Sequence, residues 1–267
     1  MSSARRLAGG LVVAALLSGC QAESPPTATA PSSPTPTSAS AGTATTTDIA
    51  LPGGRTAAVR GLGGQRSRPL IDRIAAELPG AVDAVTAFWG PDWPREIVVV
   101  VTESAEQFRV LAHGSPDIAA ATTADGMVFA PGAEDMTEPA LRIVVRHELF
   151  HVAARDRTVA SAPVWLTEGV ADYVGRPAQP VPPDGAQVAV LPTDADLQTA
   201  GPARALAYDR AWWFSRFVAE RYGAPALRAL YLRACGPGHP DAATAVRETL
   251  GVHLDQVVAQ WRAWMTR

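Results

Sequence analysis

The stretch from Thr137 to Arg155 reads TEPALRIVVRHELFHVAAR, and it decides how the rest of the chain is interpreted. Thr137 is a suitable residue to cap the N-terminus of a helix. Glu138 and Pro139 follow in the first turn, where a negative charge and a missing backbone N–H are both tolerated. The apolar residues around the middle of the stretch favour a buried helix. We therefore expect one helix through about Arg155, with polar side chains inside its buried part.

Those polar side chains are His147, Glu148 and His151, which form the pattern HExxH. Because four residues make about one helical turn, the two histidines project from one face and can share a single ion. Zinc takes neutral imidazole nitrogens as ligands, and Glu148 lies where it can take a proton from a zinc-bound water. The alternative is two surface histidines on a solvated helix. The apolar neighbours argue against it, because unpaired buried imidazoles are costly.

The next informative segment is WLTEGVADY, from Trp165 to Tyr173. Together with HExxH it resembles the gluzincin metallopeptidases, and its W-L-x-E-G-x-A-x-Y form is especially similar to the peptidase-MA-like proteins of bacteria. The resemblance implies a zincin-like fold, a zinc peptidase activity and Glu168 as the third zinc ligand. Three protein ligands also leave a fourth position open for water, which is typical of a catalytic zinc site. Gly169 is expected to allow close packing against the HExxH helix.

Two further residues are assigned by the same resemblance. Asp172 follows Glu168 by one helical turn, and we expect it to accept a hydrogen bond from His147 and so fix the tautomer of that ligand. A surface aspartate is the alternative. Tyr208 and the later segment Glu220–Gly223 are similar to the downstream pattern of the family, which implies that Tyr208 donates a hydrogen bond to the oxyanion. An ordinary half-buried tyrosine is equally compatible with the sequence.

The N-terminus has the features of an export signal. Arg5 and Arg6 precede the apolar run Leu7–Leu17, which is too short to cross a bilayer as a permanent helix. The sequence LSGC ending at Cys20 resembles a bacterial lipobox, which predicts a signal peptide over residues 1–19 and a lipid on Cys20. A plain secretory signal is the alternative. Residues 20–47, rich in Ser, Thr, Pro and Ala, are expected to form a disordered linker that holds the domain outside the cell membrane.

The charge and the cysteine content limit which binding partners and disulfides we expect. The formal net charge is −3, and loss of the leader with its arginines makes the mature chain more acidic. An acidic chain lacks the basic face that nucleic-acid binding requires, so we expect no nucleic-acid partner. The chain has two cysteines, and a lipid on Cys20 would leave Cys235 without a disulfide partner. The sequence leaves the oligomeric state open.

We expect an α+β fold in residues 48–267, with a small mixed sheet and the HExxH helix in residues 48–156 and only helices in 157–267. Residues 48–68 show no assignable element. Pro79-Gly80 is expected to kink or split the first helix. Gly126–Pro131 is expected to be a strand at or near a sheet edge. The other expected elements are a helix over Ile71–Trp89, a strand over Glu96–Thr102, a short helix after Ser104, and helices over 165–174, 202–222, 225–235, 241–250 and 254–264.

The sequence therefore predicts a zinc-dependent metallopeptidase that hydrolyses peptide or protein substrates outside the cytoplasmic membrane, with Zn²⁺ held by His147, His151 and Glu168. Two other classes fit the same residues. One is a non-catalytic zinc-binding lipoprotein that acts as a binding or assembly factor. The other is a zinc amidase that acts on cell-wall material. The presence of Glu148 counts against the first, because a purely structural zinc site has no need of that carboxylate.

Overall fold

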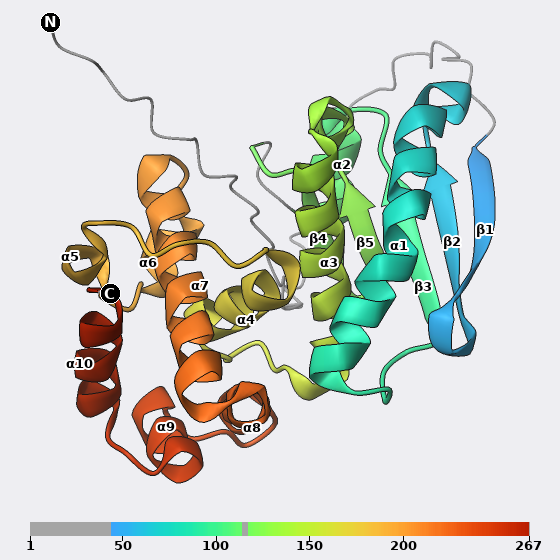
Figure 1. The fold of residues 1–267 in the computed structure, drawn as a ribbon. Coiled ribbons are helices and arrows are strands. Elements are labelled where there is room, and N and C mark those ends of the chain that lie inside the picture. The colour runs from blue at the N-terminus through green and yellow to red at the C-terminus, as the bar shows by residue number, and fades with distance from the viewer. Residues whose placement is uncertain (1–43, 114–116, 267) are drawn as a thin grey trace, which may run out of the picture.

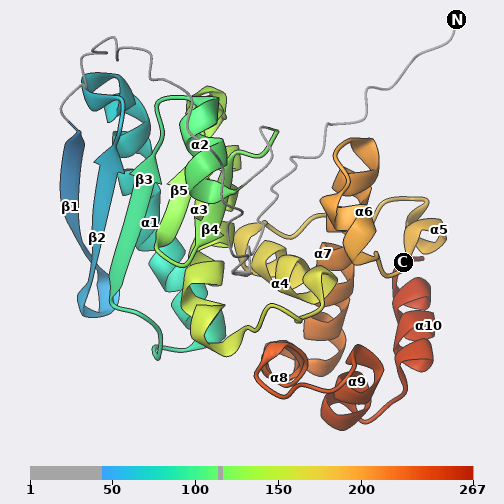
Figure 2. The same cartoon turned by 180° about the vertical axis from the view of Figure 1, so that it is seen from behind.

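The computed structural model describes residues 44–113 and 117–266, so the predicted signal peptide, Cys20 and most of the predicted linker lie outside the described residues. The described chain is a mixed α+β structure, with a five-stranded sheet followed by a mostly helical remainder (Figures 1 and 2). The expected α+β class is therefore confirmed at this level. The strands are β1 (Thr45–Leu51), β2 (Arg55–Gly61), β3 (Glu96–Val101), β4 (Ala120–Thr123) and β5 (Gly126–Phe129).

The sheet is mixed, with the strand order β1-β2-β3-β5-β4. Its three inner strands, β2, β3 and β5, are parallel, and β1 and β4 pair antiparallel with their neighbours. The hairpin of β1 and β2 occupies the segment that the sequence left unassigned. β1 begins at Thr45, before the predicted start at Asp48, because Thr45 already pairs with Gly61. The Ala and Gly residues of this hairpin carry little strand signal of their own.

The prediction for Gly126–Pro131 was right about the strand, which lies near the sheet edge but not at it. β5 lies between β3 and β4, so within the described residues the edge on this side is β4. The short run Ala120–Thr123 was not recognised as a strand because alanine has a low strand propensity. Gly126 makes the packing possible, because a side chain there would lie 2.3 Å from the backbone oxygen of Val98 on β3.

Two long helices cover one face of the sheet. α1 (Arg68–Trp89) and α3 (Glu138–Ala154) lie side by side in front of the strands in Figure 1. The predicted split of the first helix at Pro79 is wrong, since α1 continues through that residue. Buried Ile74, Leu78 and Val82 lie on both sides of the proline and pack into the common core. This packing offsets the loss of one backbone hydrogen bond.

The second half of the chain is helical, as predicted. α4 crosses the middle of the molecule, with α3 on one side and α7 on the other (Figure 1). Gly223 ends α7 with φ 94°, a conformation that favours glycine. The helices are α2 (Ala105–Ala112) in the first half and α4 (Val164–Gly175), α5 (Gly185–Val188), α6 (Asp194–Gln198), α7 (Pro202–Tyr222), α8 (Ala224–Cys235), α9 (Ala242–Leu250) and α10 (Leu254–Trp264) in the second.

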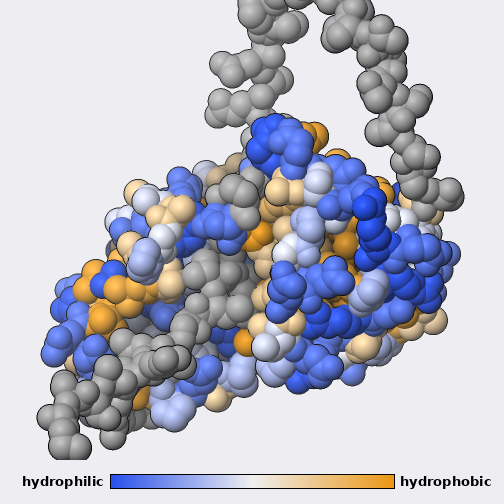
Figure 3. Space-filling model, turned by 90° about the horizontal axis from the view of Figure 1, so that it is seen from above, coloured by the Kyte–Doolittle hydropathy of each residue, from blue (hydrophilic) through white to orange (hydrophobic). Residues whose placement is uncertain are grey.

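The face seen from above in Figure 3 carries mostly polar residues, with hydrophobic ones in small groups. The large hydrophobic residues that remain exposed in the described ranges are Val110, Leu111, Val190 and Leu206. Among the described residues, no helix combines the length and the apolar character needed to cross a membrane.

Two glycines set how closely α4 approaches its neighbours. A Cβ atom at Gly169 would lie 2.5 Å from the backbone oxygen of Ala211 on α7, and one at Gly175 would lie 3.0 Å from that of Ile143 on α3. The expectation that Gly169 packs against the HExxH helix is therefore wrong, because it faces α7 instead. Gly175 makes the close contact with α3. The absence of these two side chains lets α4 lie tightly between the other two helices.

Gly169→Ala should destabilise the protein, because the new methyl group would collide with backbone that cannot move alone. We expect a loss of about 1–3 kcal/mol in the free energy of unfolding, measured by urea denaturation. Gly132→Ala is the matched control, because no atom lies within 4 Å of a Cβ there; its stability should stay within about 0.5 kcal/mol. A Gly169→Ala protein as stable as the wild type would contradict the close packing of α4 on α7.

Candidate metal centre

The helix α3 begins and ends close to where the sequence predicts. Thr137 caps it, its side chain accepting a hydrogen bond from the backbone N–H of Ala140 at 3.4 Å. His147, Glu148 and His151 all lie in its buried part, with side chains that are almost completely inaccessible. The alternative of two surface histidines on a solvated helix is therefore wrong.

The three predicted ligands converge. Nε2 of His147 lies 3.1 Å from Nε2 of His151 and 3.2 Å from Oε2 of Glu168. Nε2 of His151 lies 3.6 Å from Oε1 of Glu168. The potential ligand atoms of these residues all lie within 4.8 Å of one another. α3 therefore supplies two nitrogen donors, and α4 supplies a carboxylate that faces both.

This donor set fits a divalent metal such as zinc. Two imidazole nitrogens and one carboxylate oxygen are ligands that zinc prefers, and three protein ligands leave room for a further one. The charges around the site agree with this assignment. Glu148, Glu168 and Asp172 are buried carboxylates, whereas the buried guanidinium in contact with this group is that of Arg176, which also pairs with Asp209. A divalent cation would offset the remaining negative charge.

Asp172 lies where the sequence places it. Nδ1 of His147 donates a hydrogen bond to Oδ1 of Asp172 at 2.9 Å, and the aspartate side chain is fully buried. When His147 is neutral, as a metal ligand must be, this contact holds its proton on Nδ1 and leaves Nε2 to face Glu168 and His151. The alternative of a surface aspartate is wrong, because Asp172 has no exposed surface.

The ligands influence the pKa of one another strongly. Burial by itself would lower the pKa of His147, but hydrogen bonds to Asp172 and Glu168, and their charges, raise it to about 10. Burial would raise the pKa of Glu168, whereas the charge of His151 and contacts with both histidines lower it to about 2. In the metal-free protein, His147 is therefore protonated at neutral pH and faces the buried carboxylates of Asp172 and Glu168.

Glu148 is held by a residue that the sequence analysis missed. The hydroxyl of Thr122 on β4 donates to this glutamate, with Oγ1 2.8 Å from Oε2 and 3.0 Å from the backbone oxygen. Oε1 of Glu148 is buried and has no hydrogen-bond partner in the described structure. Burial raises the pKa of Glu148, while the two histidines and Thr122 act to lower it. No motif marks Thr122, because β4 itself was not recognised.

Tyr208 lies close to the metal centre. It projects from α7 and is 1% exposed, so it is fully buried and not half-buried. Burial and the negative charges of Glu168, Asp172 and Glu148 raise its pKa well above the usual value. The hydroxyl therefore keeps its proton at neutral pH and can act as a hydrogen-bond donor, as it does toward Glu168.

Arg176 was also missed by the sequence analysis. It follows Asp172 by four residues, and its Nη2 lies 2.6 Å from Oδ2 of that aspartate. The same guanidinium contacts Asp209 on α7 through Nη1, also at 2.6 Å. The spacing of four residues was a readable signal, because opposite charges at this separation meet on one helix face.

The chain matches no protein-family model and no curated protein. Solved structures with a related arrangement include an M1 zinc metallopeptidase from Deinococcus radiodurans, with 17% identity and a TM-score of 0.44. A mutant of that enzyme has a sequence identity of 18% and a TM-score of 0.45. A mutant two-domain M1 zinc metallopeptidase bound to L-arginine has a sequence identity of 17% and a TM-score of 0.44. The alignments cover 82–84% of this chain and 51% of those chains. The chain therefore spans about half the length of the structures it matches.

Zinc uptake at neutral pH should release a proton. Because the pKa of metal-free His147 is about 10, this imidazole is protonated near pH 7, and zinc takes only its neutral form. Titration calorimetry in buffers of different ionisation enthalpy should therefore show release of about one proton per zinc ion. Binding enthalpies that do not depend on the buffer would contradict a protonated histidine in the metal-free site.

Proposed function

We propose that the protein is a zinc-dependent metallopeptidase. The observation that supports this most is the convergence of His147, His151 and Glu168 beside a buried glutamate, Glu148, that has one unpartnered carboxylate oxygen. A structural zinc site requires ligands only. An additional carboxylate with a free oxygen beside the ligands is what a hydrolytic site requires.

Each residue of the site has a separate role in the proposed hydrolysis. When bound by His147, His151 and Glu168, zinc would supply Lewis-acid chemistry that polarises a carbonyl group and acidifies water. Glu148 takes a proton from the attacking water through Oε1 as the water oxygen bonds to the carbonyl carbon. It then passes that proton to the amide nitrogen as the C–N bond breaks. Tyr208, which remains protonated, donates a hydrogen bond to the negative charge that develops on the carbonyl oxygen.

The position of β4 supports a peptide as the substrate. β4 pairs on one side with β5 and forms the sheet edge in the described chain, and its residue Thr122 contacts Glu148. An extended peptide could add to such an edge through main-chain hydrogen bonds. Its backbone would then pass close to the proposed general base. β4, and not the neighbouring strand β5, is therefore the proposed site for an extended substrate.

We also propose that the protein acts outside the cytoplasmic membrane, held there by a lipid on Cys20. The support for this comes from the sequence: the basic start, the apolar run and the lipobox-like LSGC. The low proportion of large apolar residues in the segment that follows would let it serve as a spacer between membrane and enzyme.

Glu148→Gln should retain zinc and lose peptide hydrolysis, because the amide keeps the shape of the side chain but cannot accept the proton. We expect a loss in kcat of roughly 100- to 10,000-fold, measured on a broad peptide library with metal content determined in parallel. Glu168→Ala is the comparison variant, and it should lose zinc as well as activity.

Near-normal turnover by Glu148→Gln would exclude this glutamate as the general base. A wild-type protein that binds zinc and cleaves no peptide would instead favour the non-catalytic lipoprotein. Cleavage confined to cell-wall amides would favour the amidase.

Thr122→Val should reduce kcat with little change in KM, because it removes the hydroxyl that orients Glu148 while preserving the side-chain volume. A hydrogen bond to a charged group of this kind corresponds to a loss of roughly 10- to 100-fold. Thr122→Ser, which keeps the hydroxyl, should recover most of the activity. Equal activity of the valine and serine variants would show that this hydrogen bond does not serve catalysis.

A further inference from the structure

Arg176 is connected to the proposed metal ligand His147 through Asp172. His147 donates to Oδ1 of Asp172, and Arg176 pairs with Oδ2 of the same carboxylate at 2.6 Å. Asp172 therefore has a partner at each oxygen, a hydrogen bond from His147 at Oδ1 and an ion pair with Arg176 at Oδ2. Asp209 forms a second ion pair with the same guanidinium, with its Oδ1 2.6 Å from Nη1 of Arg176.

The environment makes these contacts strong. The side chain of Asp172 is 0% exposed and that of Arg176 is 9% exposed, so water competes little for either charge. A buried carboxylate without a positive partner is strongly destabilising, whereas a paired and hydrogen-bonded one is tolerated. When His147 is a neutral metal ligand, it contributes no full positive charge to this pair. The guanidinium then provides the charge that balances Asp172.

We infer that Arg176 is a positioning residue of the metal centre, which holds Asp172 against His147 and thereby increases the affinity for zinc. The inference rests on the metal site of the proposed function and does not require that the protein cleave peptides. Groups that orient a metal-bound histidine generally affect metal affinity, because they fix the ring and its tautomer before the metal arrives.

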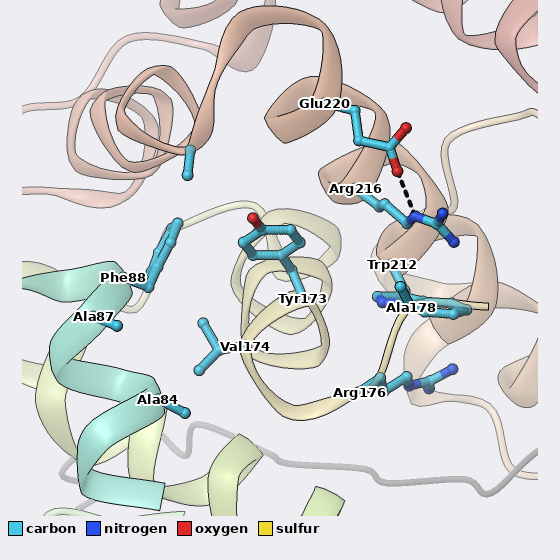
Figure 4. Close-up of a pocket in the computed structure, with 11 residues that line it drawn as sticks. Ala84, Ala87, Phe88, Tyr173, Val174, Arg176, Ala178, Trp212, Arg216 and Glu220 are labelled. Atoms are coloured by element: carbon cyan, nitrogen blue, oxygen red, sulfur yellow. Dashed lines mark hydrogen bonds and ion pairs between the residues drawn. The ribbon is translucent and has the colours of Figure 1, made fainter.

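Arg176 also joins α4 to α7 beside the proposed oxyanion donor. Its partner Asp209 directly follows Tyr208 in α7, and the guanidinium carbon lies 5.2 Å from the centre of the Trp212 ring, one turn further along. Figure 4 shows Arg176 and Trp212 together at one side of a cavity. One guanidinium thus connects the helix that carries Glu168 with the helix that carries Tyr208.

The same cavity offers a matched control. It has a volume of about 470 Å³ and is lined by Arg176, Trp212, Arg216 and Glu220, among others (Figure 4). Arg216 pairs with Glu220 at 2.7 Å, donates to the backbone oxygen of Gln179 and lies over the rings of Trp213 and Trp264. None of these partners belongs to the metal centre. A change at Arg216 therefore removes an arginine from the same cavity without touching Asp172.

The test is the zinc affinity of the full-length protein, measured by competition with a chromophoric chelator. Arg176→Gln should weaken zinc binding by roughly 10- to 100-fold, the effect expected for groups behind a metal ligand, and Arg216→Gln should change it by less than about 2-fold. When Asp172 is already replaced by alanine, Arg176→Gln should weaken zinc binding little further, because the contact between Arg176 and Asp172 is already absent.

Unchanged affinity in Arg176→Gln would overturn the inference, and so would an equal loss with and without Asp172. Circular dichroism of the metal-free variants shows whether they fold. If Arg176→Gln does not fold, the zinc affinity of Arg176→Lys is the test instead. Lysine keeps the positive charge but lacks the planar guanidinium that contacts Asp172 and Asp209 at once. Reduced affinity in the lysine variant supports the inference, and wild-type affinity overturns it.

Peptide cleavage is measured separately on the same samples. If the wild type binds zinc with the predicted dependence on Arg176 but cleaves nothing, the proposed hydrolysis fails and the inference stands. If the wild type binds no zinc, both fail.

Discussion

The structure depends on the balance between buried carboxylates and the positive groups that face them where α3 meets α4. Glu148, Glu168 and Asp172 have almost no contact with solvent, although a buried carboxylate without a partner is strongly unfavourable. His147, His151 and Arg176 surround them. A divalent ion would complete this balance, and in its absence the raised pKa of His147 supplies a proton in the same place. Binding of a divalent ion would therefore be coupled to the stability of this region.

The helices α3, α4 and α7, which carry the residues of the site, pack closely against one another. Gly169 allows α4 to approach α7, and Gly175 allows it to approach α3, because neither carries a side chain that would meet the facing backbone. Close approach places Glu168 opposite the two histidines and brings Tyr208 near the carboxylates. Backbone packing of this kind fixes distances better than flexible side chains can, which a site with several converging ligands requires.

The sheet contributes through its edge. β4 places Thr122 against Glu148, and so the strand that could receive an extended peptide also orients the proposed general base. Arg176 plays a comparable part on the far side of the site, where it connects the carboxylate behind His147 with α7. The proposed chemistry is thus supported from two directions by residues that touch no metal ligand directly.

Local sequence determined the helices and the ligands, whereas tertiary packing decided the environment around them. The spacing of His147 and His151 predicts a shared face because helical geometry is local, and helix signals such as Thr137 or Gly223 act within one turn. The roles of β4, Thr122 and Gly169 could not be obtained in the same way, because each depends on a partner from another element. The pairing of Arg176 with Asp172 has a local signal in its spacing, but its contact with Asp209 depends on the packing of α7. The energy that selects such distant partners is the burial and pairing of groups far apart in the chain.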